Sequence, residues 1–186
     1  MRTLSALSVF SILCALLAGC GGSAADDPKV TLRVTPAKTD QQLSWQWTLR
    51  NDDTAPVVIL DGAVDGTSGL PQVWITPGED GTVEVAYRWL APPDGVDVAR
   101  PVLQAGHTIA PGASASGTAQ VSLPLHIRHP YASAFDPPLA LPGGPGTDVQ
   151  FCIGVVRAAD VAPQAGGSYA HVGSAVQRQR LVCGTR

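Results

Sequence analysis

Two stretches early in the chain alternate apolar and polar side chains with a period of two, and this pattern restricts the fold more than any other feature. They are residues 30–35 and 43–50, whose apolar members are Val30, Leu32, Val34, Leu43, Trp45, Trp47 and Leu49. Successive side chains of a strand point to opposite faces, so this period predicts two strands that each bury one face. The two tryptophans share the aliphatic face, which favours a place in the core over a sugar-binding platform.

Further segments of strand length follow. Asn51-Asp52-Asp53-Thr54 is a turn cluster, and residues 57–60 are apolar on both faces, as expected of a central strand. More strands are predicted at residues 72–76, 82–90, 118–125, 149–157 and 176–183, separated by Gly, Pro and Asp turn signals. No long segment has a helical period with caps. The pattern predicts an all-β fold with little helix: an antiparallel β-sandwich of about seven to nine strands, with a β-barrel as the alternative.

Pieces of this pattern resemble bacterial immunoglobulin-like domains. They are Leu49-Arg50-Asn51 followed by Pro56-Val57, and Ile109-Ala110-Pro111-Gly112 leading into a strand. The resemblance implies an immunoglobulin-like sandwich and, since such folds host many activities, implies no particular function.

The N-terminal residues have the features of a secretory signal. Arg2 precedes an apolar stretch, Leu4–Ala18, of 15 residues, shorter than the roughly 20 needed to cross a bilayer core. Leu17-Ala18-Gly19-Cys20 resembles the lipobox of bacterial lipoproteins at all four positions. The resemblance implies cleavage before Cys20, a diacylglycerol on its thiol and acylation of the new amine, which together anchor a protein stably. An ordinary signal peptide with an incidental Cys20 is the alternative.

Three segments are therefore expected: a signal peptide at 1–19, a tether of small and polar residues at 20–28, and a single β-sandwich domain at 29–186. The expected location is the bacterial cell envelope. Gly21 stands where the Asp of inner-membrane retention would stand, so a Gram-negative cell would place the protein on the outer membrane, facing the periplasm.

Cysteine usage is consistent with export. Cys14 lies in the signal and Cys20 is the predicted lipidation site, which leaves Cys152 and Cys183 as a disulfide pair. If residues 149–157 and 176–183 pair antiparallel with these cysteines opposite each other, the midpoint falls in a loop signal at Gly167-Ser168. Arg178 and Arg180 would then face solvent from the last strand. A two-cysteine metal site is the rival interpretation.

The composition and motifs argue against several functions. The chain has 12 basic and 15 acidic residues and a net charge of −3, with no basic block for nucleic acid. It lacks the G-x-S-x-G, phosphate-loop and H-E-x-x-H motifs, so no enzyme activity and no cofactor are predicted. A weaker alternative is a metal-dependent enzyme that uses His126, His129 and Asp136. A protease-inhibitor-like domain is a further alternative.

A long connection, residues 128–147, contains five prolines and is the candidate binding loop. Its residue types are those enriched at recognition surfaces: Arg128, His129, Tyr131, Phe135 and Asp136. A crossover between sheets, with aromatic side chains covering the core, explains the same residues structurally. The expectation is a lipid-anchored, non-catalytic module that binds an envelope protein or polymer through loops at one end.

Overall fold

The structure is a computed structural model that describes residues 27–63, 72–144 and 147–184. The predicted signal peptide, Cys20 and most of the predicted tether lie outside these residues. The described residues contain no helix long and apolar enough to cross a membrane.

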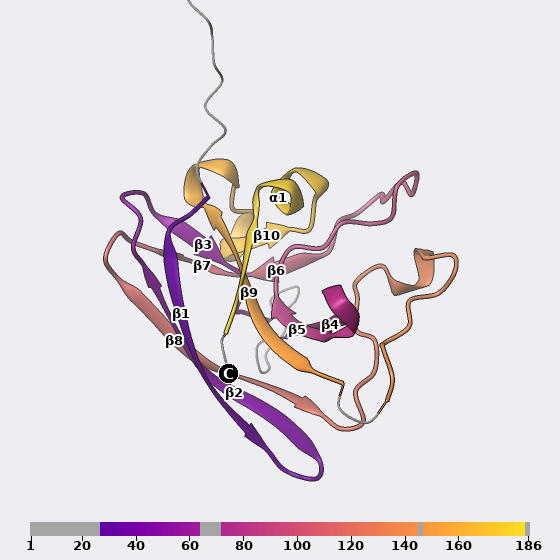
Figure 1. The fold of residues 1–186 in the computed structure, drawn as a ribbon. Coiled ribbons are helices and arrows are strands. Elements are labelled where there is room, and N and C mark those ends of the chain that lie inside the picture. The colour runs from indigo at the N-terminus through magenta and orange to yellow at the C-terminus, as the bar shows by residue number, and fades with distance from the viewer. Residues whose placement is uncertain (1–26, 64–71, 145–146, 185–186) are drawn as a thin grey trace, which may run out of the picture.

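The described chain is all-β, with antiparallel and mixed sheets (Figure 1). Its strands are β1 (Val30–Lys38), β2 (Gln42–Asn51), β3 (Val57–Ile59), β4 (Trp74–Pro77), β5 (Val83–Tyr87), β6 (Leu103–Ala105), β7 (His107–Ile109), β8 (Ser114–Ser122), β9 (Val149–Arg157), β10 (Ser168–Ala170) and β11 (Arg180–Cys183). One short helix, α1 (Gly173–Arg178), accompanies 3₁₀ turns at Glu79–Gly81, Ala132–Ala134, Ala158–Asp160 and Ala165–Gly167.

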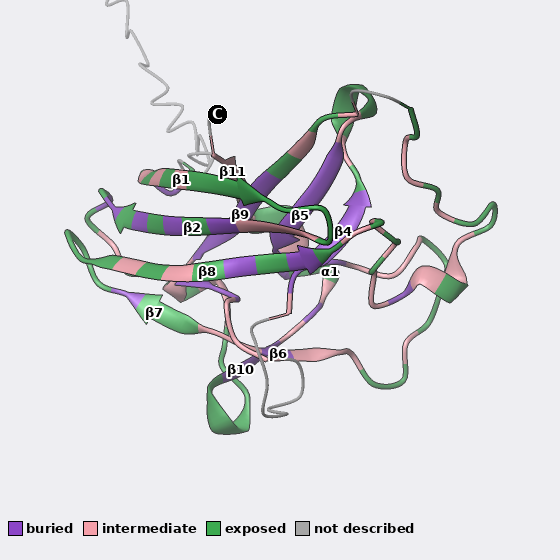
Figure 2. Cartoon of the chain, turned by 90° about the horizontal axis from the view of Figure 1, so that it is seen from below, coloured by how far each residue is buried: buried purple, intermediate pink, exposed green. Residues whose placement is uncertain are grey.

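The strands form separate sheets, as a sandwich requires and a single closed barrel does not. One sheet has the order β1-β2-β8 and is antiparallel throughout. The other has the order β4-β5-β9-β3-β7, with β11 also pairing with β9. A small third sheet joins β6 and β10. Figure 2 shows buried and exposed residues alternating along β2 and β8, the half-buried pattern that the period of two predicts.

The main core lies between the two large sheets. It takes Trp45, Trp47 and Leu49 from β2 and residues of β3, β5 and β9 from the opposite sheet. The prediction that both tryptophans are core residues is confirmed, since they are 5% and 3% exposed.

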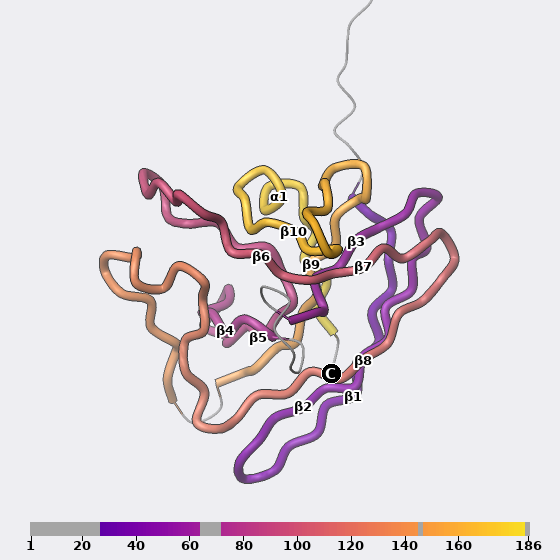
Figure 3. The backbone as a smooth tube through the Cα atoms, turned by 180° about the vertical axis from the view of Figure 1, so that it is seen from behind, coloured from indigo at the N-terminus to yellow at the C-terminus, as the bar shows by residue number. Residues whose placement is uncertain are grey.

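A second, smaller core covers the other face of β3 and β9. Val58 and Val156 pack there with Trp89, Tyr169 of β10 and Ala175 of α1. Figure 3 shows α1 and β10 close to β3 and β9. Because β3 is covered on both faces and lies between β9 and β7, the prediction of a central strand here is confirmed.

Three details of the fold correct the sequence analysis. The described residues form eleven strands, more than the predicted seven to nine. The additional strands β6, β7 and β10 have three residues each, too few to show an alternating pattern. The last strand begins at Arg180, and the residues before it form α1, so Arg178 is a helix residue paired with Asp160. Strands β5 and β9 run parallel, so the sheet is mixed.

Candidate binding cleft between the sheets

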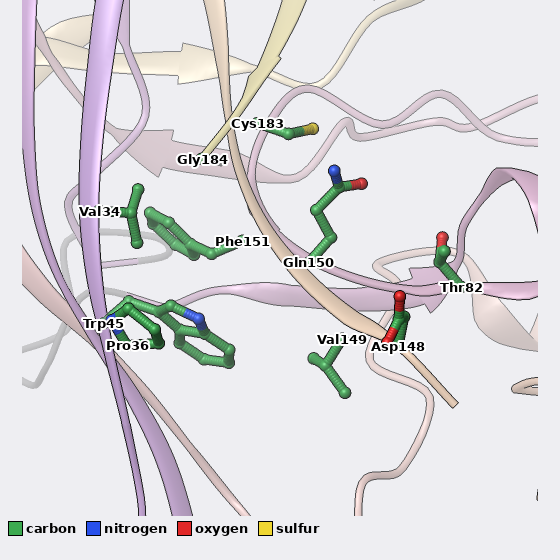
Figure 4. Close-up of a pocket in the computed structure, with 10 residues that line it drawn as sticks. All are labelled: Val34, Pro36, Trp45, Thr82, Asp148, Val149, Gln150, Phe151, Cys183 and Gly184. Atoms are coloured by element: carbon green, nitrogen blue, oxygen red, sulfur yellow. The ribbon is translucent and has the colours of Figure 1, made fainter. Parts of the chain in front are cut away.

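An apolar cleft opens along the seam between the two large sheets. It has a volume of about 470 Å³ and is lined by Val34, Pro36, Trp45, Thr82, Asp148, Val149, Gln150, Phe151, Cys183 and Gly184 (Figure 4). One wall is β1 with the start of β2, and the other is the start of β9 with the end of β11. Ligand sites in proteins have this size and this mixture of an apolar lining with a few polar groups.

Two aromatic rings form the base of the cleft. The indole of Trp45 stacks on the ring of Phe151, with centroids 5.6 Å apart and planes at 18°. Tyr87 meets the other side of Phe151 edge-on, with centroids 5.8 Å apart. Trp45 and Phe151 are nearly fully buried, whereas Val34 and Val149, which also line the cleft, are only partly buried. The cleft therefore offers preformed apolar surface.

The upper end of the cleft is closed by the last described residues. Cys183 is bonded to Cys152 and pairs with it across β9 and β11, so the predicted disulfide and its register are confirmed. Gly184 then donates from its N–H to the carbonyl of Phe151 at 3.0 Å. A Cβ at Gly184 would overlap the side chain of Val34, so β1 and the end of β11 touch there. Past this contact β1 continues to Lys38 without β11 beside it.

The cleft lies far from the point where the predicted tether joins the domain. That point is held by hydrogen bonds from Lys29 N to Asp53 Oδ2 and from Arg180 Nη1 to the Pro28 carbonyl. From Val30 to Pro36 the chain advances six residues along β1, about 20 Å at the rise of a strand. In Figure 1 the chain enters β1 at the top and β1 runs downward from there. The residues of β1 that line the cleft, Val34 and Pro36, belong to its second half.

The Asp53 carboxylate binds the backbone of Lys29, where the predicted tether joins the domain. Hydrogen bonds from the backbone N–H groups of Lys29, Ala55 and Thr54 and the charge of Arg157, at 3.1 Å, lower the pKa of Asp53 against the opposing effect of burial. The group is ionised at neutral pH and serves as a structural acceptor.

A network of buried polar side chains lies apart from the cleft, around Gln104. Its Oε1 accepts from Trp74 Nε1 at 3.0 Å and from His171 Nε2 at 3.1 Å, and its Nε2 donates to the carbonyls of Leu60 and Gln72. His171 Nδ1 in turn accepts from Leu90 N–H. Burial lowers the pKa of His171 to about 4, so the ring is neutral. Every hydrogen-bonding atom of Gln104 and His171 is used, which makes this network structural.

The candidate binding loop is attached to the domain through some of its own recognition-type residues. Arg128 bridges to Ile75 through its backbone, and Tyr131 is 8% exposed. The Tyr131 hydroxyl donates to the His171 carbonyl at 3.1 Å and accepts from Val102 N–H at 3.4 Å. A side chain buried in this way holds the loop, as the crossover interpretation describes.

The rest of the loop is more open. The His129 ring meets Phe135 edge-on at 4.9 Å, and burial, with the charge of Arg88, lowers the pKa of His129 to about 4. Phe135 is partly buried and Asp136 is exposed. Binding through this loop stays a prediction.

The histidines are not gathered into a metal site in the described part of the chain, where no three His, Cys, Asp or Glu residues are placed to hold an ion. His126 is exposed, His129 is turned toward Phe135 and Tyr131, and Nδ1 of His129 accepts from Tyr131 N–H. The structure therefore does not bring His126, His129 and Asp136 together.

The cleft is a site that the sequence analysis missed. Its walls come from residues 34–36 and 148–151, more than a hundred residues apart, and from the end of β11. Trp45 was predicted as a core residue, which is correct. That one side of Trp45 lines an open cleft depends on where β11, paired with β9, ends, and no local pattern shows this.

No protein-family model matches the chain, and comparisons with curated proteins and with solved structures also give no match.

Proposed function

We propose that this protein is a lipid-anchored, non-catalytic binding module of the bacterial cell envelope, and that its ligand enters the cleft between the sheets. The observation that carries the proposal is the preformed apolar cleft over the Trp45–Phe151 stack. A cleft of this kind retains a ligand by burying apolar surface, at about 25 cal/mol per Å². Binding is the chemistry that the described lining supports, because its polar side chains are those of Thr82, Asp148 and Gln150.

The anchoring half of the proposal comes from the lipobox resemblance. Cys20 carries the acyl chains, and the tether joins the domain at the end away from the cleft. The cleft is then directed from the membrane toward the compartment that the domain faces. The disulfide supports an oxidising compartment such as the periplasm. The immunoglobulin-like resemblance implies no particular function and adds no specific partner.

Two linked measurements test the proposal in intact cells. The first is membrane fractionation of Cys20→Ser, which we expect to release the protein while its fold is retained. The second is photo-cross-linking from position 36 at the cleft mouth, with position 135 in the loop and exposed position 177 as controls.

We expect one abundant adduct from position 36 that Val149→Glu abolishes. Membrane retention of Cys20→Ser would overturn the anchor. An adduct from position 135 but not from 36 would overturn the cleft and identify the loop as the docking surface.

A further inference from the structure

The long strand β1 has one free edge where it borders the cleft. Among the described residues, β1 pairs with β2 only, and Gly184, the residue after β11, is the last one that contacts it, at Val34. In the described part of the chain no second strand pairs with Val34–Lys38, the last five residues of β1. An exposed strand edge offers unpaired N–H and C=O groups to another chain, and this one lies next to uncovered apolar surface.

The register shows which backbone groups face the edge. Thr39 N–H donates to the Gln42 carbonyl at the hairpin, and Asp52 N–H donates to the Lys29 carbonyl at the other end. Hydrogen-bonded positions alternate in an antiparallel pair, so odd-numbered residues of β1 bond to β2. The even-numbered residues therefore direct their backbone groups outward, at Val34, Pro36 and Lys38. Pro36 has no N–H, so one donor is missing in the middle of this edge.

The side chains of the same residues define the faces of any added strand. Val34 and Pro36 point toward the cleft, whereas Arg33 and Thr35 point to the outer face. On its outer face β1 carries the positive charge of Arg33 and no acidic residue, although the chain as a whole is acidic. An acidic side chain on the outer face of an added strand would therefore be complementary in charge to β1.

We propose that the cleft receives an extended peptide segment of a partner protein, which adds as a strand to Val34–Lys38. The segment alternates apolar side chains, which enter the cleft over Trp45 and Phe151, with acidic ones that face Arg33. Main-chain hydrogen bonds supply affinity, and the cleft selects the apolar positions. This inference rests on the proposed function and names the partner class for the same cleft.

The test uses a fluorescein-labelled octapeptide, acetyl-Thr-Val-Glu-Phe-Glu-Val-Thr-Gly-amide, and the mature domain in fluorescence anisotropy. Two versions of the peptide carry N-methyl groups on alternate backbone amides: one has them at the odd-numbered positions, the other at the even-numbered positions. Each version therefore lacks the N–H donors of one edge of the extended peptide. We expect one version to lose binding by at least ten-fold and the other to bind as the parent does, because only one set faces β1. Equal binding of both versions would overturn strand addition.

Pro36→Val is expected to increase the affinity for the peptide. The substitution restores an outward N–H and keeps an apolar wall, so we expect about five-fold tighter binding, the effect of one hydrogen bond. Thr35→Val is the matched control, since it changes a neighbouring side chain and no outward donor. Unchanged binding by Pro36→Val, with circular dichroism showing an intact fold, would contradict the proposal.

Charge reversal tests the acidic character of the partner. Arg33→Glu should weaken the acidic peptide about five-fold and strengthen its Glu→Lys counterpart. Arg50→Glu, the same change on β2 one strand away from the edge, should leave both unchanged.

The remaining outcomes identify other occupants. A dimer of the unmixed protein in sedimentation, disrupted by Val149→Glu, would make a second copy the occupant and overturn the proposal. Loss of all peptide binding, together with a retained cross-link from position 36, would reject the peptide and leave the proposed function standing.

Discussion

The imidazole of His171 donates from Nε2 to Oε1 of Gln104 across 3.1 Å, with both side chains almost completely buried. The donor assignment follows from Leu90 N–H, which occupies Nδ1 and leaves the proton on Nε2. This bond joins β6, which carries Gln104, to the segment after β10. A fully satisfied polar network of this kind favours one arrangement of a small sheet that contributes little apolar burial.

Gln104→Leu should be among the most destabilising single changes in the protein. It leaves Trp74 Nε1, His171 Nε2 and the carbonyls of Leu60 and Gln72 without their partner. Several unsatisfied buried groups cost about 3 to 5 kcal/mol of unfolding free energy. Urea denaturation measures it, with exposed Gln120→Leu as the matched control, which should lie within about 0.5 kcal/mol of wild type. A similar midpoint for both variants would contradict the structural role of Gln104.

Stability should fall as the pH drops from about 6.5 to 4. Burial lowers the pKa of His171 to about 4, whereas an unfolded histidine titrates near 6.5. Above pH 6.5 both states are neutral and no proton is linked to unfolding. Below pH 6.5 the unfolded state binds a proton that the folded state does not bind. The free energy of unfolding therefore falls by up to about 3 kcal/mol by pH 4. His129, with its pKa also lowered to about 4, acts in the same direction.

Urea midpoints at half-unit steps from pH 7.5 to 4.5 measure this effect. His171→Phe should be less stable at pH 7.5, because Leu90 N–H loses its acceptor, but its loss between pH 6.5 and 4.5 should be smaller. Asp53 does not interfere, since its lowered pKa places its own loss of stability below about pH 4. A slope identical to wild type would show that His171 is not the titrating group.

Much of the fold was predictable because most long strands carry their own signal. The alternation in β1 and β2 and the two-faced apolar run of β3 each follow from local sequence. The register of Cys183 with Cys152 followed from pairing the two remaining cysteines, which lie 31 residues apart. The strands that were missed have three residues each, too few to show a period. Residues 176–178 of α1 were predicted as part of the last strand, because a helix of six residues is too short to show a helical period.

The site was less predictable because it depends on where an element stops. The cleft exists because β11 ends at Cys183 while β1 continues to Lys38. Sequence shows the composition of each strand, but not how far it extends past its neighbour in another sheet. The candidate loop was visible because it is a continuous segment. Burial of Tyr131 within it depends on contacts with Val102 and His171 that no local pattern indicates.

Reduction of the disulfide should destabilise the protein and disturb the cleft. The bond closes a loop between residues 31 apart, which on the chain-entropy model contributes about 3 to 4 kcal/mol, or about 10 °C in Tm. Thermal unfolding with and without reductant measures the loss, and Cys152→Ala with Cys183→Ala should reproduce it and no longer respond to reductant. Two free thiols in protein from the periplasm would contradict the pairing.

Asn51 joins two turns at one end of the sandwich and provides the last prediction. Its Oδ1 accepts from Asp53 N–H, and its Nδ2 donates to the carbonyls of Ala55 and Ile109, each at 2.9 Å. The side chain is fully buried.

Asn51→Asp keeps the acceptor but places a carboxylate against two carbonyl oxygens. We therefore expect it to be at least as destabilising as Asn51→Ala, at about 2 to 4 kcal/mol by urea denaturation. The neighbouring exposed Asp52→Asn is the control for a charge change in the same turn and should cost less than about 1 kcal/mol. A stable Asn51→Asp would mean that the two donated hydrogen bonds do not hold the turn after β2 to the end of β7.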